Sequence, residues 1–219
     1  SAQMISYEIA MGMSVVPVLL LAGNVTLRTI VNQKAEMHVW NVLTLSVAFV
    51  TFLISAFAET NRLPFDMPEA ESELITGYHT EYSAMKFSLC MIAEYANMVT
   101  QSAMIATLFF GGWDIPFTSA DNAGAVSFPL VLLSFAIMAV KVVFFIFFYI
   151  WVRWTLPRFR YDQLMSLGWK FLLPLALAYI VIVASLMLAL DAMGIQRGVV
   201  YGGIFLAVNA VILFALFSF

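Results

Sequence analysis

The chain has 219 residues, of which 63% are hydrophobic and only 11% are charged, and its formal net charge is −3. Its mean hydropathy of +0.96 is too high for a soluble domain, whose surface has to face water. The acidic balance does not indicate nucleic-acid binding. The single cysteine, Cys90, lies in an apolar run. Disulfides, thiolate zinc sites and Cys-ligated iron–sulfur clusters are therefore excluded within the chain, and we expect no bound metal.

Six apolar stretches have the length that a membrane-spanning helix needs, which is roughly 20 residues. They cover about residues 4–22, 40–58, 83–111, 128–152, 171–190 and 199–219. We therefore predict an all-α integral membrane protein with at least six transmembrane helices, in which residues 1–219 form a single transmembrane domain. The loops between the spans are predicted at 23–39, 59–82, 112–127, 153–170 and 191–198.

The distribution of Lys and Arg predicts how the chain is oriented. Loops 59–82 and 153–170, with the adjoining Lys86, contain Arg62, Lys86, Arg153, Arg158, Arg160 and Lys170. The other loops contain Arg28, Lys34 and Arg197. The two richer loops are therefore predicted to be cytoplasmic, together with the C-terminus. The segment 111–117 is predicted to close the third span on the outer side, because its Trp suits an interface and its Pro stops the helix.

The loop 59–82 combines acids with apolar residues. Its charged and titratable residues are Glu59, Asp66, Glu69, Glu71, Glu73 and Glu81, with Arg62 and His79. A solvated cytoplasmic loop is one interpretation, since charge runs usually face water. Interleaved apolar residues such as Leu63, Phe65 and Leu74, together with Pro64 and Pro68, favour a loop that folds back against another surface.

Glu8, Glu94 and Lys141 are ionisable residues that lie well inside predicted spans. Such residues are rare and costly in a membrane and usually have a function. A structural alternative is a Glu94–Lys141 pair that holds two helices in register. Asn97 and Gln101 follow Glu94 at i+3 and i+7, so one helix face carries a polar stripe that is predicted to point into the bundle.

Closely spaced carboxyl groups in this setting would take up protons. Two carboxylates about 6 Å apart, at an effective dielectric constant near 20, repel by roughly 3 kcal/mol. That repulsion corresponds to about two pKa units, and burial raises the pKa further. A partly buried acid cluster would titrate as a coupled set near neutral pH, as a proton relay requires. The chain has no visible place for a redox cofactor, so any oxidoreductase role has to be shared with partners.

The acidic loop and its surroundings resemble one family. The segment 58–74, AETNRLPFDMPEAESEL, and its continuation 77–83 resemble the signature of the quinone-chamber subunit (the H subunit) of bacterial respiratory complex I, NADH-quinone oxidoreductase. The same family is called NADH dehydrogenase subunit 1 in mitochondria. Similar matches lie at 2–8, 93–95, 153–165 and 168–170. Members have eight or nine spans, and this chain resembles the C-terminal part, from the fourth span onward. It begins at Ser1 without a signal-peptide pattern, and we interpret this start as a truncation or an unseen front part.

The resemblance implies a membrane-arm subunit of a proton-pumping NADH:quinone oxidoreductase. In the family, this subunit lines a tunnel for the quinone, ubiquinone or menaquinone, which is the bound substrate. Arg62, Phe65 and Asp66 would shape that tunnel, and Arg62 would pair within its loop. The acids that match the family's path for proton and charge coupling are Glu8, Glu59, Asp66, Glu69, Glu71, Glu73, Glu81 and Glu94.

The same resemblance implies partners and a location. NADH, FMN and iron–sulfur clusters would be bound only in partner subunits, because this chain alone has no complete redox site. The expected partners are the peripheral-arm quinone-site subunits, the antiporter-like membrane subunits and the lipid bilayer, without nucleic acid. The expected location is the bacterial inner (plasma) membrane, with the mitochondrial inner membrane or the thylakoid as alternatives.

Three other functions are compatible with a chain of this composition. A homologous membrane subunit of an energy-converting hydrogenase or formate hydrogenlyase shares the fold and parts of the acidic loop, although the complete Glu-Thr-Asn-Arg to Glu-Tyr-Ser stretch favours complex I. A stand-alone secondary transporter would need paired broken helices, which Pro17 and Pro174 do not convincingly supply. A passive anchor for a soluble enzyme would retain coupling after Glu8 and Glu94 are neutralised.

Overall fold

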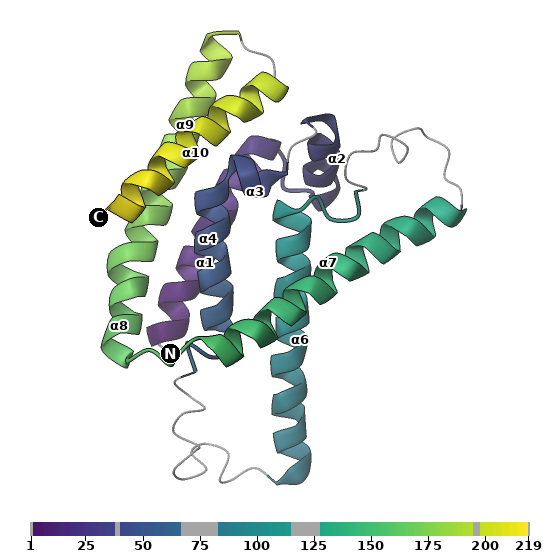
Figure 1. Cartoon of the computed structure of the whole chain (residues 1–219), viewed down its shortest axis with the longest axis vertical. Coiled ribbons are helices and arrows are strands. Elements are labelled where there is room, and N and C mark those ends of the chain that lie inside the picture. The colour runs from purple at the N-terminus through teal and green to yellow at the C-terminus, as the bar shows by residue number, and fades with distance from the viewer. Residues whose placement is uncertain (1, 38–39, 67–82, 115–127, 195–197, 219) are drawn as a thin grey trace.

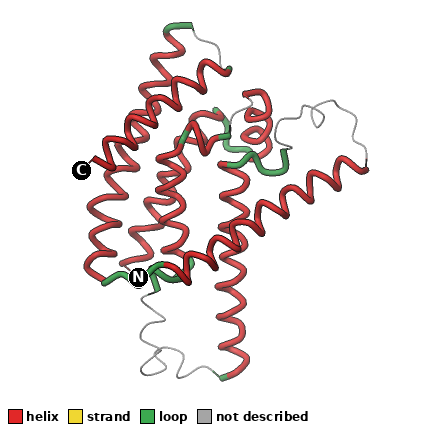
Figure 2. The backbone as a smooth tube through the Cα atoms, in the orientation of Figure 1, coloured by secondary structure: helices red, strands yellow, loops and turns green. Residues whose placement is uncertain are grey.

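The chain is helical throughout the part that a computed structural model describes, which comprises residues 2–37, 40–66, 83–114, 128–194 and 198–218 (Figures 1 and 2). Within these ranges there is no strand, and the prediction of an all-α fold is confirmed for them. An apolar segment in lipid has to satisfy its backbone groups internally, which a helix does. Among the described residues, three helical stretches are long and apolar enough to cross a membrane: Gln3–Ala22, Phe128–Thr155 and Tyr161–Ala192.

The helices follow the order of the predicted apolar stretches, with short additions. They are α1 (Ala2–Ala22), α2 (Leu27–Met37), α3 (Asn41–Thr44), α4 (Ser46–Glu59), α6 (Ala84–Phe109), α7 (Phe128–Thr155), α8 (Tyr161–Ser166), α9 (Leu173–Ala192) and α10 (Val199–Ser218). The stretch predicted as one span at 40–58 contains two helices, because the backbone breaks at Leu45 (φ −128°, ψ 47°). Two side-chain hydrogen bonds join α3, beside the break, to α6 and α10. Asn41 Nδ2 donates to the carbonyl of Leu108 at 3.1 Å, and Asn209 Nδ2 donates to the carbonyl of Thr44 at 2.5 Å.

The prediction of a loop at 153–170 is wrong for its second half, because the residues from Tyr161 onward are helical. A π-helical segment, Leu167–Leu172, joins α8 to α9, so one continuous helix begins at Tyr161. The polar residues of this stretch predict a loop. Its buried residues Leu164, Gly168 and Leu172 nevertheless recur every fourth position, which is the spacing of one helix face.

The helices form two packed groups that meet at α4. Helix α1 packs against α4 and α9, while α6 packs against α7 and also contacts α4; Figure 1 shows α1 beside α4, and α7 crossing α6 obliquely. A large apolar core fills the middle of the bundle. A smaller cluster lies at the end where α1 begins and includes Tyr7, Phe57, Tyr149 and Leu164. This second cluster supports the chain that leaves α4.

Candidate functional site

The chain turns sharply after α4, at the start of the predicted acidic loop. Thr60 ends the helix by donating its N–H to the carbonyl of Ala56 at 3.1 Å. Asn61 has a φ of +48°, a left-handed conformation that Asn adopts more readily than most residues. The N–H of Phe65 then donates to the carbonyl of Arg62 at 2.8 Å. These contacts direct residues 62–66 back toward the beginning of α1.

Phe65 fixes this turn against two other parts of the chain. Its side chain is buried, and its ring meets the edge of Tyr7 with centroids 5.6 Å apart and lies 5.7 Å from the ring of Phe159. Gln3 Nε2 donates to the Phe65 carbonyl at 3.2 Å. Residues 60–66 therefore fold back onto the bundle. Residues 67–82, with Glu69, Glu71, Glu73 and Glu81, lie outside the described residues, and their folding stays a prediction.

Asp66 is held by an arginine from a distant part of the chain. Arg158 Nη2 lies 3.3 Å from Asp66 Oδ2, and the Asp66 side chain is 6% exposed, against 31% for Arg158. The N–H of Phe159 donates to the carbonyl of Pro64 at 3.2 Å. The two loops predicted to be cytoplasmic thus contact each other at one end of the bundle.

Two of the predicted coupling acids, Glu59 and Glu8, lie close enough for the charge of Glu8 to act on Glu59. Glu59 is the last residue of α4 and is partly buried. Burial raises the pKa of its carboxyl above the usual value, and the negative charge of Glu8 raises it further. Glu8 itself is exposed on α1. A proton relay needs acids whose proton affinity depends on the charge of a neighbouring carboxylate.

Lys141 does not pair with Glu94. Its Nζ donates to the backbone carbonyls of Phe110, Gly112 and Asp114 at 2.9, 2.8 and 3.2 Å. The structural alternative that sequence reasoning left open is therefore wrong, because Lys141 binds carbonyls at the C-terminal end of α6, where a helix leaves its last acceptors unsatisfied and favours positive charge.

The polar stripe on α6 is buried only at one end. Gln101 is 7% exposed, whereas Glu94 and Asn97 are partly exposed. The stripe thus enters the bundle at Gln101, and Glu94 lies nearer the surface of this chain.

Arg62 lies against the aromatic ring of Tyr95 on α6. The guanidinium carbon is 4.5 Å from the centroid of that ring, within the range of a cation–π interaction. Arg62 is 7% exposed. The resemblance implies that Arg62 pairs within the loop 59–82, and because residues 67–82 of that loop lie outside the described residues, this pairing stays a prediction.

Sequence reasoning gave no role to three residues that hold this site in place: Gln3, Tyr7 and Arg158. The Tyr7 hydroxyl donates to the carbonyl of Leu164 at 2.9 Å and so joins α1 to α8. Arg158 pairs with an acid 92 positions away. A basic residue next to a predicted span is a weak signal, and only the fold identifies its partner.

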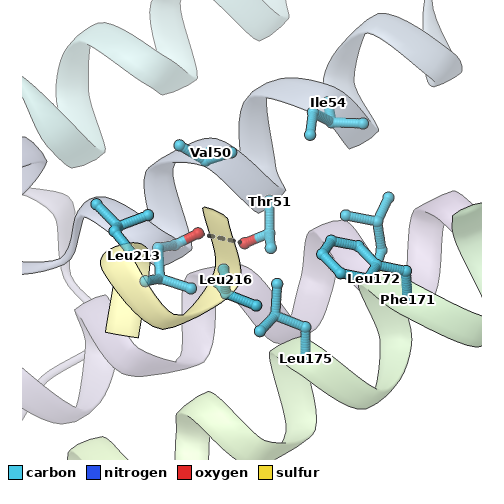
Figure 3. A pocket seen from close by; sticks show the side chains of 9 residues that line it. Val50, Thr51, Ile54, Phe171, Leu172, Leu175, Leu213 and Leu216 are labelled. Carbon is cyan, nitrogen blue, oxygen red and sulfur yellow. Dashed lines mark hydrogen bonds between the residues drawn. The ribbon is translucent and has the colours of Figure 1, made fainter. Parts of the chain in front are cut away.

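A separate cavity lies between α4, α9 and α10 and is almost wholly apolar. Its volume is about 180 Å³. Figure 3 shows it, and its lining is Val47, Val50, Thr51, Ile54, Phe171, Leu172, Leu175, Leu213 and Leu216. The hydroxyl of Thr51 is engaged by the carbonyls of Val47 and Ala48 in its own helix, both at 3.0 Å. The cavity therefore lacks the few free polar groups that orient a ligand headgroup.

Long apolar helices with ionisable groups gathered at one end of the bundle are typical of helical membrane proteins. The chain belongs to the NADH dehydrogenase family, whose model matches residues 1–184. It is 51% identical over 193 residues to the H subunit of NADH-quinone oxidoreductase from Flavobacterium johnsoniae, covering 87% of this chain and 54% of the relative.

Two further relatives have names of subunits of the same enzyme. The chain is 52% identical over 191 residues to NADH-quinone oxidoreductase subunit 8 of Rhodothermus marinus, covering 84% of this chain and 56% of the relative. It is 46% identical over 205 residues to the H subunit of the same enzyme from Salinibacter ruber, covering 89% of this chain and 59% of the relative. The chain thus spans a little over half the length of the curated relatives it matches.

Proposed function

We propose that this chain is a membrane-arm subunit of a proton-pumping NADH:quinone oxidoreductase, which lines the quinone-binding tunnel and starts the carboxylate path for charge coupling. The names of its relatives support this proposal. The chain spans the bacterial inner membrane with six helices and works beside peripheral-arm and antiporter-like subunits. Those partners, or others in the assembly, bind NADH, FMN and the iron–sulfur clusters.

The observation that carries the proposal is the folded turn at residues 60–66 next to a partly buried acid. Phe65 and Asp66 are fixed by α1 and by the segment after α7, and Glu59 stands at the beginning of the same turn with Glu8 nearby. A rigid polar turn that adjoins coupled carboxyl groups can convert a change of charge on a quinone into a change of protonation.

The roles within the proposal follow the order of these groups. Arg62, Phe65 and Asp66 shape the tunnel near the quinone, and Glu69, Glu71 and Glu73 respond to its charge. Glu8, Glu59, Glu81 and Glu94 carry the response into the membrane arm. Reduction of the quinone creates negative charge or draws protons, and either change shifts the protonation of neighbouring acids.

The proposal is tested in the complete assembly with Glu94→Gln, which keeps the shape of the side chain but cannot ionise. Quinone-linked NADH oxidation and proton pumping should fall by roughly tenfold or more, since a positioned proton-transfer group contributes at least that much. NADH oxidation by an artificial acceptor that takes electrons from the peripheral arm should be unchanged. Asp162→Asn, which changes an exposed acid on α8, is the matched control. Full quinone turnover and pumping in Glu94→Gln would contradict the role of this acid.

The kind of assembly is tested separately with an inhibitor that binds in the quinone tunnel. Inhibition of the electron transfer catalysed by the parent assembly supports a quinone oxidoreductase. A fully active assembly that evolves hydrogen and ignores the inhibitor would instead identify the hydrogenase-type relative.

A further inference from the structure

Ser55, on α4, differs from the other buried serines and threonines of the described residues. Each of the others donates its hydroxyl to a backbone carbonyl three or four positions earlier, as Ser and Thr inside helices commonly do. These residues are Ser6, Ser14, Thr44, Thr51, Thr60, Ser102 and Thr107. Ser55 is 0% exposed, yet its hydroxyl has no hydrogen-bond partner among the described residues. Because buried polar groups are almost always hydrogen-bonded, this hydroxyl requires a partner other than its own helix.

Glu59, the last residue of α4, lies one turn beyond Ser55 on the same face of the helix. Residues four positions apart are neighbours on a helix surface. Helical side chains also lean over the turn that precedes them, so Glu59 covers the side of the helix on which Ser55 lies. The Oε2 atom of Glu59 is buried and likewise has no hydrogen-bond partner among the described residues. A donor and an acceptor without described partners therefore occupy neighbouring positions.

The surroundings of this pair come from the chain itself, since α4 packs against α1, α6 and α9 (Figure 1). The titratable and charged groups at this end of α4 are Tyr7 and Glu8 on α1, Arg62 in the turn, Tyr95 on α6 and Tyr149 on α7. The Tyr7 hydroxyl is engaged by the Leu164 carbonyl. The Tyr149 hydroxyl has no described partner, and the charge of Glu59 reaches it. Tyr149 is therefore the rival of Ser55 as a donor to Glu59.

We propose that Ser55 is a positioning residue for Glu59: through an ordered water molecule its hydroxyl donates to the Glu59 carboxylate and favours the ionised form. Buried waters typically bridge polar groups that have no other partner, and hydrogen bonds to a charged acceptor are the stronger ones. The negative charge of Glu8 acts in the opposite direction and favours the protonated form. These opposed influences let Glu59 both take up and release a proton. The inference deepens the role of Glu59 in the proposed function and rests on it.

The test follows the infrared band of the protonated Glu59 carboxyl in the purified complete assembly, with the band assigned by its loss in Glu59→Gln. Ser55→Ala removes only the hydroxyl and introduces a strong helix former, so the assembly should still fold. In this variant the band should persist to a pH about half a unit to one unit higher, because the ionised carboxylate loses a donor. Ser102→Ala is the matched control, since Ser102 is equally buried but donates to the Met98 carbonyl at 2.8 Å. It should leave the titration unchanged.

Spectra in water labelled with heavy oxygen test the bridge. A water band that shifts with the isotope should be present in the parent assembly and missing in Ser55→Ala, and its absence from the parent would overturn the water as the bridge. An unchanged carboxyl titration in Ser55→Ala would overturn the role of Ser55, as would an equal shift in Ser102→Ala or a shift found only in Tyr149→Phe. The titration requires no electron transfer, so it can reveal the contact even where full quinone turnover in Glu59→Gln contradicts the proposed function.

Discussion

Arg158 and Asp66 form an ion pair across 92 positions of sequence, with Nη2 and Oδ2 3.3 Å apart. The pair joins the segment after α7 to the turn after α4, where the predicted quinone-site residues lie. The carboxylate is almost fully buried, while the guanidinium is one-third exposed. Removing the arginine therefore leaves a charge in a place that water reaches poorly.

Arg158→Gln should destabilise the turn at residues 60–66 by about 1–2 kcal/mol, less than for a fully buried pair because Arg158 is partly hydrated. In the complete assembly we expect a lower melting temperature and slower quinone-linked turnover. Arg160→Gln changes an exposed arginine two positions away and is the matched control.

A double-mutant cycle with Asp66→Asn separates the pair from other effects of each variant. The double variant should be less impaired than the sum of the single ones, because the second change removes a group whose ion pair the first change has already broken. Strict additivity would show that the ion pair contributes nothing to the stability of the turn.

Glu59 should make stability depend on pH in a defined direction. Burial, and then the charge of Glu8, raises the pKa of Glu59 from its ordinary 4.5. The folded state therefore binds a proton more readily than the unfolded state, and its stability falls as the pH rises from 4.5 through the raised pKa. Glu59→Gln cannot ionise. The melting temperature of Glu59→Gln minus that of the parent assembly should increase as the pH rises through that range, and it should stay constant at higher pH.

Glu8→Gln tests whether the charge of Glu8 contributes to the raised pKa of Glu59. With the neighbouring charge removed, the pKa of Glu59 should fall, while remaining above the ordinary value because burial is the larger cause. The infrared band of the protonated carboxyl, assigned by its loss in Glu59→Gln, should titrate at lower pH in Glu8→Gln. An unchanged titration would mean that the two acids are not coupled.

Local pattern was sufficient to predict the long apolar helices, but not their breaks, nor α2 and α8, which lie in the predicted loops 23–39 and 153–170. The apolar runs located α1, α6 and α7 to within a few residues, because an apolar run of spanning length is a strong signal for a helix. The break at Leu45 could not be predicted, since it depends on Asn41 and Asn209 reaching carbonyls of other helices.

The candidate site was predictable as a set of residue types and not as a set of contacts. The family resemblance identified Glu59 and Arg62, and charge inside an apolar span identified Lys141. Their partners come from distant segments: Tyr95 for Arg62 and backbone carbonyls after α6 for Lys141. Complementary charge alone suggested Glu94 as the partner of Lys141, because the sequence does not show which backbone carbonyls a side chain can reach.

Lys141→Met should destabilise the end of α6, since one ammonium group binds three carbonyls there. Hydrogen bonds to a charged group contribute about 1.5–3 kcal/mol, so a clear drop in the melting temperature of the assembly is expected. Lys86→Met, at the exposed beginning of the same helix, should have little effect. Because Lys141 does not contact Glu94, the effects of Lys141→Met and Glu94→Gln on stability should add. Measurable coupling between them would restore the rejected pair.

Gly168→Ala tests the close packing of the π-helical segment on α1. A Cβ at this position would lie 2.9 Å from Ser6 Oγ and 3.5 Å from Tyr7 Cε2, and Ser6 is held by its hydrogen bond to the Gln3 carbonyl at 2.8 Å. Overpacking of this kind costs about 1–3 kcal/mol. The melting temperature of the assembly should fall, and Ser6→Gly should restore part of the loss by removing the opposing side chain. Gly12→Ala, where a Cβ meets nothing within 4 Å, is the control. An equal effect in the two Ala variants would show that the loss comes from changes in the helix backbone and not from this contact.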